Sequence, residues 1–159
     1  MVKKVISGGQ TGADIAGLIA AKKLGIETGG TMPKGFRTLK GPRPEYAKLY
    51  NIKEHSSWAY PPRTECNVKD SDGTIRFATN WFSAGEKCTR NLIEKHKKPY
   101  IDVDPNLRGK FNEMTPETVR EWIRDNNIQI LNVAGNSEET SPGIAKLVIT
   151  YLTQVLGDP

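Results

Sequence analysis

The sequence has 159 residues, 36% hydrophobic and 26% charged, a profile typical of one globular domain and not of a disordered chain. Its net charge of +5 comes from basic residues scattered along the chain, which does not favour a dedicated nucleic-acid binder. Cys66 and Cys88 form no disulfide framework or metal pattern, and no apolar stretch is long enough for a signal peptide or a membrane span. We therefore expect a cytoplasmic protein that forms a single domain over residues 1–159.

A strand followed by a helix is predicted at the start of the chain. Residues 2–7 are rich in β-branched side chains, and residues 13–24 carry apolar residues at helical spacing up to Gly25, a typical helix C-cap. Residues 26–28 are predicted to form a short strand. Residues 29–44 are rich in Gly, Pro, Lys and Arg and are predicted to be an irregular connection.

Strands and helices continue to alternate in the middle of the chain. Strands are predicted over 50–55, 74–78 and 100–103, because each run contains β-formers such as Ile together with Tyr or Phe. A helix is predicted over 89–97, where the apolar residues lie at helical spacing.

The last third of the chain carries the clearest signals. Thr115-Pro116 begins a helix, with a hydroxyl N-cap and proline in the first turn. A strand is predicted over 128–133, a loop over 134–141, and a final helix begins at Ser141-Pro142 with its apolar residues on one face. The alternation of strands and helices predicts an α/β fold with a mostly parallel sheet and helices on both faces.

A glycine-rich loop separates the first strand from the first helix. Backbone amides and the positive end of the helix dipole can bind an anion at such a loop, and glycine lets the anion approach closely. The spacing fits neither G-x-G-x-x-G nor a P-loop. The alternative is a tight turn without a ligand. We predict phosphate binding, and expect Gly12→Val to lose the ligand while the domain stays folded. The candidate residues of this loop are Gly8, Gly9, Gln10, Thr11, Gly12 and Asp14.

Two further loops are expected at the same edge of a parallel sheet. One covers 82–89, contains Gly85 and Thr89, and is a candidate for a second anion site at a helix start. The other covers 136–143 and follows the strand that contains Asn132. Three loops that converge on one crevice predict a small-molecule site.

A densely polar segment precedes the strand predicted over 74–78. Arg63 can bind a phosphate with two parallel hydrogen bonds, and Asn67 can hold a loop in place. Asp70 and Asp72 can bind Mg²⁺ beside a phosphate or orient a ligand hydroxyl. The alternative is a helix end and an Asp-Gly turn, in which the aspartates bind their own backbone.

Six segments together resemble a known family. They are 8–14, 33–35, 63–65, 67–74, 131–135 and 142–144. In this order they resemble the family named "putative molybdenum carriers", which belongs to the SLOG group of Rossmann-like domains. Lys34, in the second segment, joins the candidate phosphate ligands through this resemblance.

The resemblance implies a Rossmann-like, doubly wound sheet and a homo-oligomer, either a dimer or a tetramer. It also implies binding of molybdenum cofactor or a related phosphorylated pterin or nucleotide, and leaves the participation of Mg²⁺ open. The chain departs from the family pattern over 83–89, where Glu86 and Lys87 stand in place of small residues. The glutamate-bearing stretch of the related cytokinin-activating phosphoribohydrolases is absent, so their chemistry is not carried over.

Three functions are compatible with these motifs. The first is a binding module without turnover, which acts as a carrier or sensor for a phosphorylated small molecule. The alternative is a hydrolase of a nucleotide N-glycosidic or phosphate bond, with Asp72 or Glu86 as acid or base. A third is DNA binding through Trp58, Tyr60, Arg63 and Lys69, but core packing and surface charge explain these residues more simply. No residues have metal-ligand spacing, so we expect no metal held by the protein itself.

Overall fold

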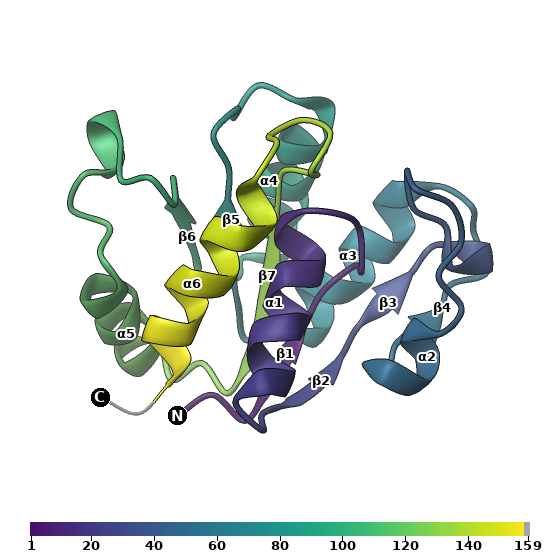
Figure 1. Ribbon diagram of the computed structural model, residues 1–159, viewed down its shortest axis with the longest axis horizontal. Coiled ribbons are helices and arrows are strands. Elements are labelled where there is room, and N and C mark those ends of the chain that lie inside the picture. Colours follow the sequence, from purple (N-terminus) through teal and green to yellow (C-terminus); the bar gives the residue numbers. More distant parts are fainter. Residues whose placement is uncertain (158–159) are drawn as a thin grey trace.

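Five parallel strands form the central sheet of the structure, a computed structural model that describes residues 1–157 (Figure 1). The strand order is β2-β1-β7-β5-β6, and all neighbouring strands run parallel. The strands are β1 (Lys4–Ile6), β2 (Glu27–Gly29), β5 (Gly73–Phe77), β6 (Tyr100–Val103) and β7 (Ile130–Gly135). With helices on both faces of this sheet, the predicted Rossmann-like α/β fold is confirmed.

Helices cover the sheet on both sides. They are α1 (Ala13–Lys23), α3 (Tyr60–Asp70), α4 (Ala84–His96), α5 (Pro116–Asp125) and α6 (Ile144–Leu156). In Figure 1, α1 and α6 lie in front of the sheet and α3 and α4 behind it. Helix α1 approaches β7 closely because Gly17 has no side chain; a Cβ there would come within 2.7 Å of Val133. None of the helices in residues 1–157 is long and apolar enough to cross a membrane.

The core lies between the sheet and its helices. Strand β5 is buried along its whole length, as expected for a central strand of a sheet covered on both faces. The ring of Phe77 at the end of β5 packs edge-to-face on Tyr151 of α6, with 5.4 Å between ring centroids. This packing holds the carboxyl ends of the central strands in place, and the loops of the site begin at those ends.

A second, two-stranded parallel sheet lies outside the main sheet. It pairs β3 (Thr31–Met32) with β4 (Lys53–Glu54), next to the short helices η1 (Lys34–Phe36) and α2 (Tyr46–Leu49). The strand predicted over 50–55 is thus only two residues long. The connection predicted to be irregular contains β3 and η1. Such short elements leave little periodicity for a sequence pattern to reveal.

Two helices differ from the prediction. Helix α3 was considered only as an alternative, through its end near Asp70, and its start was not predicted, although Pro61 and Pro62 in its first turn are a typical start signal. Helix α4 begins at Ala84, five residues before the predicted start at 89, because the Ser83 hydroxyl caps it by accepting from the Glu86 amide at 3.3 Å. Much of the predicted 82–89 loop is therefore the first turns of a helix.

The order of the strands determines where a crevice forms. The chain passes from β1 to β2 on one side of the sheet and from β5 to β6 on the other, while β7, late in sequence, lies between β1 and β5. Connections that leave in opposite directions open a space beyond the carboxyl ends of the strands. The ends of β1, β5 and β7 meet at this point.

Candidate functional site

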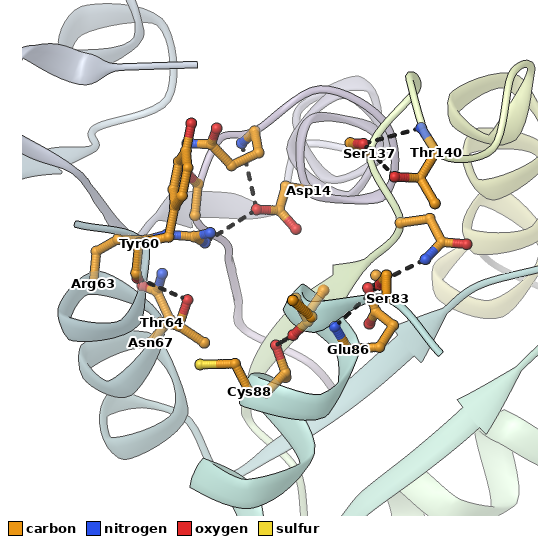
Figure 2. A pocket seen from close by; sticks show the side chains of 18 of the residues that line it. Asp14, Tyr60, Arg63, Thr64, Asn67, Ser83, Glu86, Cys88, Ser137 and Thr140 are labelled. Atoms are coloured by element: carbon orange, nitrogen blue, oxygen red, sulfur yellow. Dashed lines mark hydrogen bonds and ion pairs between the residues drawn. The ribbon is translucent and has the colours of Figure 1, made fainter. Parts of the chain in front are cut away.

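A cavity of about 490 Å³ lies at the carboxyl edge of the sheet, where the segments after β1, β5 and β7 meet α3 (Figure 2). This volume is in the range of small-molecule sites. The structure therefore brings together the three predicted loops. The predicted site residues that line the cavity are Gly8, Gln10, Asp14, Arg63, Asn67, Gly85, Glu86, Thr89 and Asn132.

The carboxylate of Asp14 occupies the glycine loop from inside the protein. Asp14 lies in the first turn of α1 and is 5% exposed. Its Oδ2 accepts a hydrogen bond from the Gln10 amide at 3.3 Å, and the Gly9 amide donates to Ser7 Oγ at 3.2 Å. These two amides, which we expected to bind a ligand phosphate, thus already have acceptors within the protein.

Gly9 and Gly12 face the protein and not the cavity. A Cβ on Gly9 would come within 2.7 Å of the Met32 sulfur, and a Cβ on Gly12 would overlap the carbonyl oxygen of Asn136. Both glycines have positive φ, which a side chain would strain. Contrary to our expectation from the sequence, Gly12→Val would therefore disturb the fold and would not isolate ligand binding.

Helix α3 forms one wall of the cavity with Tyr60 and Arg63. Arg63 Nη1 lies 3.4 Å from Asp14 Oδ2, while its buried Nε has no hydrogen-bond partner among the described residues. The guanidinium carbons of Arg37 and Arg63 lie 4.2 and 5.4 Å from the Tyr60 ring centroid. This wall therefore combines the aromatic ring of Tyr60 with a hydrogen-bond donor, Nε of the positively charged Arg63, that has no partner in the described residues.

Helix α4 presents its first turn to the cavity, and Ser83, Ala84, Gly85 and Glu86 all line it. The first amides of a helix have no acceptor within the helix. The Ser83 hydroxyl accepts a hydrogen bond from the amide of Glu86. The amides of Ala84 and Gly85 have no acceptor in the described residues and are available to a ligand.

Helices α3 and α6 begin at the same edge, and fewer backbone donors are free in their first turns. At the start of α6, the amides of Gly143 and Ala145 donate to the carboxylate of Glu138 at 2.6 and 3.0 Å. At the start of α3, Pro61 and Pro62 have no N–H. At the start of α4, the amides of Ala84 and Gly85 have no acceptor among the described residues, and both residues line the cavity.

Glu86 is buried beneath the first turn of α4. It is 3% exposed, its Oε2 accepts from Asn136 Nδ2 at 3.2 Å, and its Oε1 has no partner in the described part of the chain. Figure 2 shows Glu86 beside Ser83, with Asp14 and Arg63 on other sides of the same cavity.

Both buried carboxyl groups titrate near neutral pH. Burial raises the pKa of Asp14 to about 6, although the Arg63 charge opposes the rise. Burial raises the pKa of Glu86 to about 7; the Arg76 charge opposes this rise, and the Asp14 carboxylate adds to it. The cavity therefore contains two acids that can change protonation in the physiological range.

Several predicted residues at the cavity have hydrogen bonds within the protein. Asn67 accepts from the Thr31 amide at 2.9 Å and donates to the Thr31 carbonyl at 3.0 Å, and so holds β3 as the sequence suggested. Thr89 donates to the carbonyl of Gly85, and Asn132 donates to Thr74 Oγ1. These side chains shape the wall and the floor of the site.

Asp70 and Asp72 do not reach the site, which corrects their proposed roles in Mg²⁺ binding and catalysis. Both precede β5 and lie at the amino edge of the sheet, opposite the cavity. The Asp72 carboxylate accepts the amides of Gln129 and Ile130 at 3.0 and 2.8 Å. Of the alternative that the sequence left open, the helix end is present, since α3 ends at Asp70, but Asp72 binds the distant backbone at the start of β7 and not its own turn.

Thr11 and Lys34 also lie outside the cavity lining. Gln10 lines the cavity, but its side chain binds the protein backbone. Thr11 Oγ1 donates to Glu139 at 2.5 Å. Lys34 Nζ lies 5.7 Å from the ring centroid of Trp58. The Gln10 side chain donates to the Arg37 carbonyl at 2.9 Å and so ties the glycine loop to the connection after β3.

The cavity has lining residues that sequence reasoning did not single out as ligands. Thr64, Ser137, Thr140 and Asn136 bring polar side chains, and Leu39 an apolar one. The helix start signal at the double proline could have revealed the Thr64 side of the site. Within residues 1–157, no group of three His, Cys, Asp or Glu side chains could hold a metal ion.

A parallel sheet covered on both faces, with a crevice where the strand connections diverge, defines a Rossmann-like ligand-site architecture. Residues 5–156 match the model of the circularly permutated YpsA SLOG family, and the chain belongs to this family. The SLOG membership that the motifs indicated is thus confirmed.

A solved structure is similar to the chain over almost its whole length. It is the crystal structure of a "putative molybdenum carrier protein" from Syntrophus aciditrophicus SB, with 35% identity and a TM-score of 0.88. The match covers 98% of this chain and 95% of the other. No curated protein matches the chain.

Proposed function

We propose that this protein binds a phosphorylated small molecule of nucleotide or pterin size, as a carrier or sensor. The observation that carries the proposal is the open first turn of α4, which shares a cavity of about 490 Å³ with the guanidinium of Arg63. Helix starts and guanidinium groups are the two donors that proteins most often use for phosphate.

The two sides of the cavity suggest how such a ligand lies. The amides of Ala84 and Gly85 and the free Nε of Arg63 can donate to phosphate oxygens. Tyr60 and Leu39 offer apolar surface to the flat ring of a purine or pterin.

Molybdenum cofactor is one candidate ligand, because the similar crystal structure is named for a molybdenum carrier. The residues present fit its phosphate, through Arg63 and the start of α4. They offer no cluster of metal ligands within residues 1–157, so the pterin itself would hold the metal, and the whole cofactor would be cargo.

The proposal is tested by calorimetric titration of the protein with AMP and with adenosine, and by native mass spectrometry for a co-purified ligand and molybdenum. We expect AMP to bind at least tenfold more tightly than adenosine, because the phosphate makes charge-assisted hydrogen bonds. Equal affinities would contradict a phosphate site.

The matched variant combines Arg63→Met with Asp14→Asn. Removing Arg63 alone would leave the buried Asp14 carboxylate without its cation, which destabilises the fold. The double variant removes both charges, so we expect it to stay folded and to lose most of the preference for AMP.

A hydrolase that cleaves a nucleotide N-glycosidic bond is the second candidate. The observation that favours it is Glu86, which lines the cavity and has a buried carboxyl oxygen without a partner in the described residues. Such a group can serve as a general acid near neutral pH. Chromatography of AMP incubated with the protein tests this: free adenine that disappears with Glu86→Gln would support the hydrolase, and intact AMP would contradict it.

A further inference from the structure

Glu86 has a polar atom for which the protein provides no partner. One of its carboxyl oxygens, Oε2, accepts from Asn136, whereas Oε1 is buried without a hydrogen bond in the described residues; Glu86 itself lines the cavity. Buried polar atoms are nearly always satisfied, so Oε1 requires a partner from outside the protein chain, a water or a ligand.

Asn136 decides which oxygen of Glu86 can carry a proton. Its Oδ1 accepts the amides of Thr79 and Asn80, both at 3.0 Å, so its orientation is fixed and its Nδ2 must face Glu86. Because Nδ2 can only donate, Oε2 of Glu86 is an acceptor. A proton on Glu86 therefore resides on Oε1, the buried oxygen that has no partner in the described residues.

The nearest cation does not pair with the Glu86 carboxyl group. Arg76 Nε and Nη2 both donate to the carboxylate of Asp102 at 2.8 Å, and its Nη1 donates to the backbone carbonyl of Glu86, also at 2.8 Å. The Arg76 charge is thus neutralised by Asp102. No counter-ion touches the side chain of Glu86 in the described structure.

The charged groups around Glu86 come from every element that borders it. Asp14 of α1 faces the same cavity and Asp102 lies on β6, while Arg63 of α3 is paired with Asp14 and Arg76 of β5 with Asp102. On the other side of Glu86, a second cavity is lined by Lys87 and Arg90 of α4 and by Lys110; Arg90 pairs with Glu94, and the two lysines are exposed to solvent. Ionised Glu86 would therefore add an uncompensated charge to a buried site, in line with the pKa of about 7 that its burial produces.

We propose that Glu86 is a specificity-determining residue of the cavity: it enters the complex as a neutral carboxylic acid, and its Oε1 donates a hydrogen bond to an oxygen of the ligand. Binding then takes up a proton wherever free Glu86 is ionised. This inference rests on the proposed function, because a phosphate or ring carbonyl oxygen is the acceptor. An anionic ligand strengthens the effect, since its charge further disfavours the Glu86 carboxylate.

The first test examines Glu86 without a ligand. Infrared difference spectra of wild type minus Glu86→Gln should show the carbonyl stretch of a protonated carboxylic acid at pH 6, fading by pH 8. Absence of this band at pH 6 would show ordinary ionisation of Glu86 and would overturn the proposal.

The second test measures AMP affinity at pH 6 and pH 8 for the same pair of proteins. The amide of Glu86→Gln can donate from the position of Oε1 at any pH. We therefore expect the wild type to lose about tenfold in affinity relative to Glu86→Gln between pH 6 and pH 8, from the pKa of about 7. Ionisation of the AMP phosphate affects both proteins and cancels in the ratio.

Glu94→Gln is the control, because Glu94 is on the same helix, is exposed and pairs with Arg90. It should follow the wild type at both pH values. Loss of AMP binding by folded Glu86→Gln at both pH values would show that binding requires the carboxylate. The same change of AMP affinity with pH in Glu86→Gln and wild type would show that Glu86 does not contact the ligand. Either result overturns the inference. If the wild type itself binds no AMP, the proposed function fails instead, and with it the ligand contact.

Discussion

At the scale of single residues, the site is defined by the polar atoms that the protein leaves unused. The sequence of the glycine loop predicts an anion site. In the structure, however, the Gln10 amide of this loop donates a hydrogen bond to the Asp14 carboxylate. Buried side-chain atoms without a partner in the described residues lie elsewhere, at Arg37 Nε, Tyr60 Oη, Arg63 Nε and Glu86 Oε1, and the first amides of α4 are also unpaired there. A sequence pattern can identify donors, but it cannot reveal which of them are already bonded.

Gly85→Ala tests the start of α4 as the ligand's binding place. A Cβ on Gly85 would meet nothing within 4 Å, and alanine favours a helix over glycine by about 1 kcal/mol. We expect the variant to be as stable as the wild type or more so, and to bind AMP at least tenfold more weakly, because the methyl group enters the cavity. Calorimetric titration and thermal unfolding measure the two effects.

The control for Gly85→Ala is Asn91→Ala, which also raises helix propensity in α4 but changes an exposed residue outside the cavity lining. It should leave AMP affinity unchanged. Undiminished affinity in Gly85→Ala would place the phosphate away from this helix.

At the scale of elements, α3 connects the main sheet to the small β3–β4 sheet. Asn67 of α3 makes two hydrogen bonds to the backbone of Thr31 in β3, both buried. The same helix carries Tyr60 and Arg63 to the cavity. The position of this wall of the site therefore depends on how firmly α3 holds β3.

Asn67→Ala should destabilise the protein by about 2 to 4 kcal/mol, because the buried N–H and C=O of Thr31 lose their partners. The measurement is urea unfolding, combined with hydrogen exchange of the Thr31 amide, which should become fast. An unchanged exchange rate at Thr31 would mean that Asn67 does not hold β3, and Asn91→Ala again serves as the surface control.

At the scale of the whole molecule, the buried acids link stability to pH. In the folded state the pKa of Glu86 is about 7, above its ordinary value of 4.5, so the folded protein binds more protons than the unfolded chain between these values. The stability contributed by neutral Glu86 is therefore fully present below about pH 4.5 and is lost as the pH rises through 7.

We expect the free energy of unfolding of the wild type to fall relative to that of Glu86→Gln by about 3 kcal/mol, as an order of magnitude, between pH 4.5 and pH 8. Urea unfolding of both proteins at several pH values measures this difference. Parallel pH curves for the two proteins would show that Glu86 has the same pKa in the folded and unfolded states. Asp14 is present in both proteins, so its titration differs between them only through its charge coupling with Glu86.

The sequence by itself determined the elements with strong local signals. The alternation of strands and helices, the Thr115 N-cap and the apolar faces of the last helices depend on neighbours within a few residues, and they predicted the α/β fold. The motif order indicated the SLOG group, which the family match confirmed. The loop over 82–89 was mistaken in part for irregular chain, because a single N-cap, Ser83, decides where α4 begins.

Only the tertiary structure decided which polar residues share a site. Asp72 and Glu86 look alike in sequence as acids beside a central strand, but β5 separates them, so that one binds the start of β7 at the amino edge and the other faces the cavity at the carboxyl edge. Asp14, Asn136 and Glu86 are far apart along the chain and meet because β7 lies between β1 and β5. Burial and long-range pairing determine the protonation of the two acids and the hydrogen bonds that these residues still have free. Neither can be read from the local sequence.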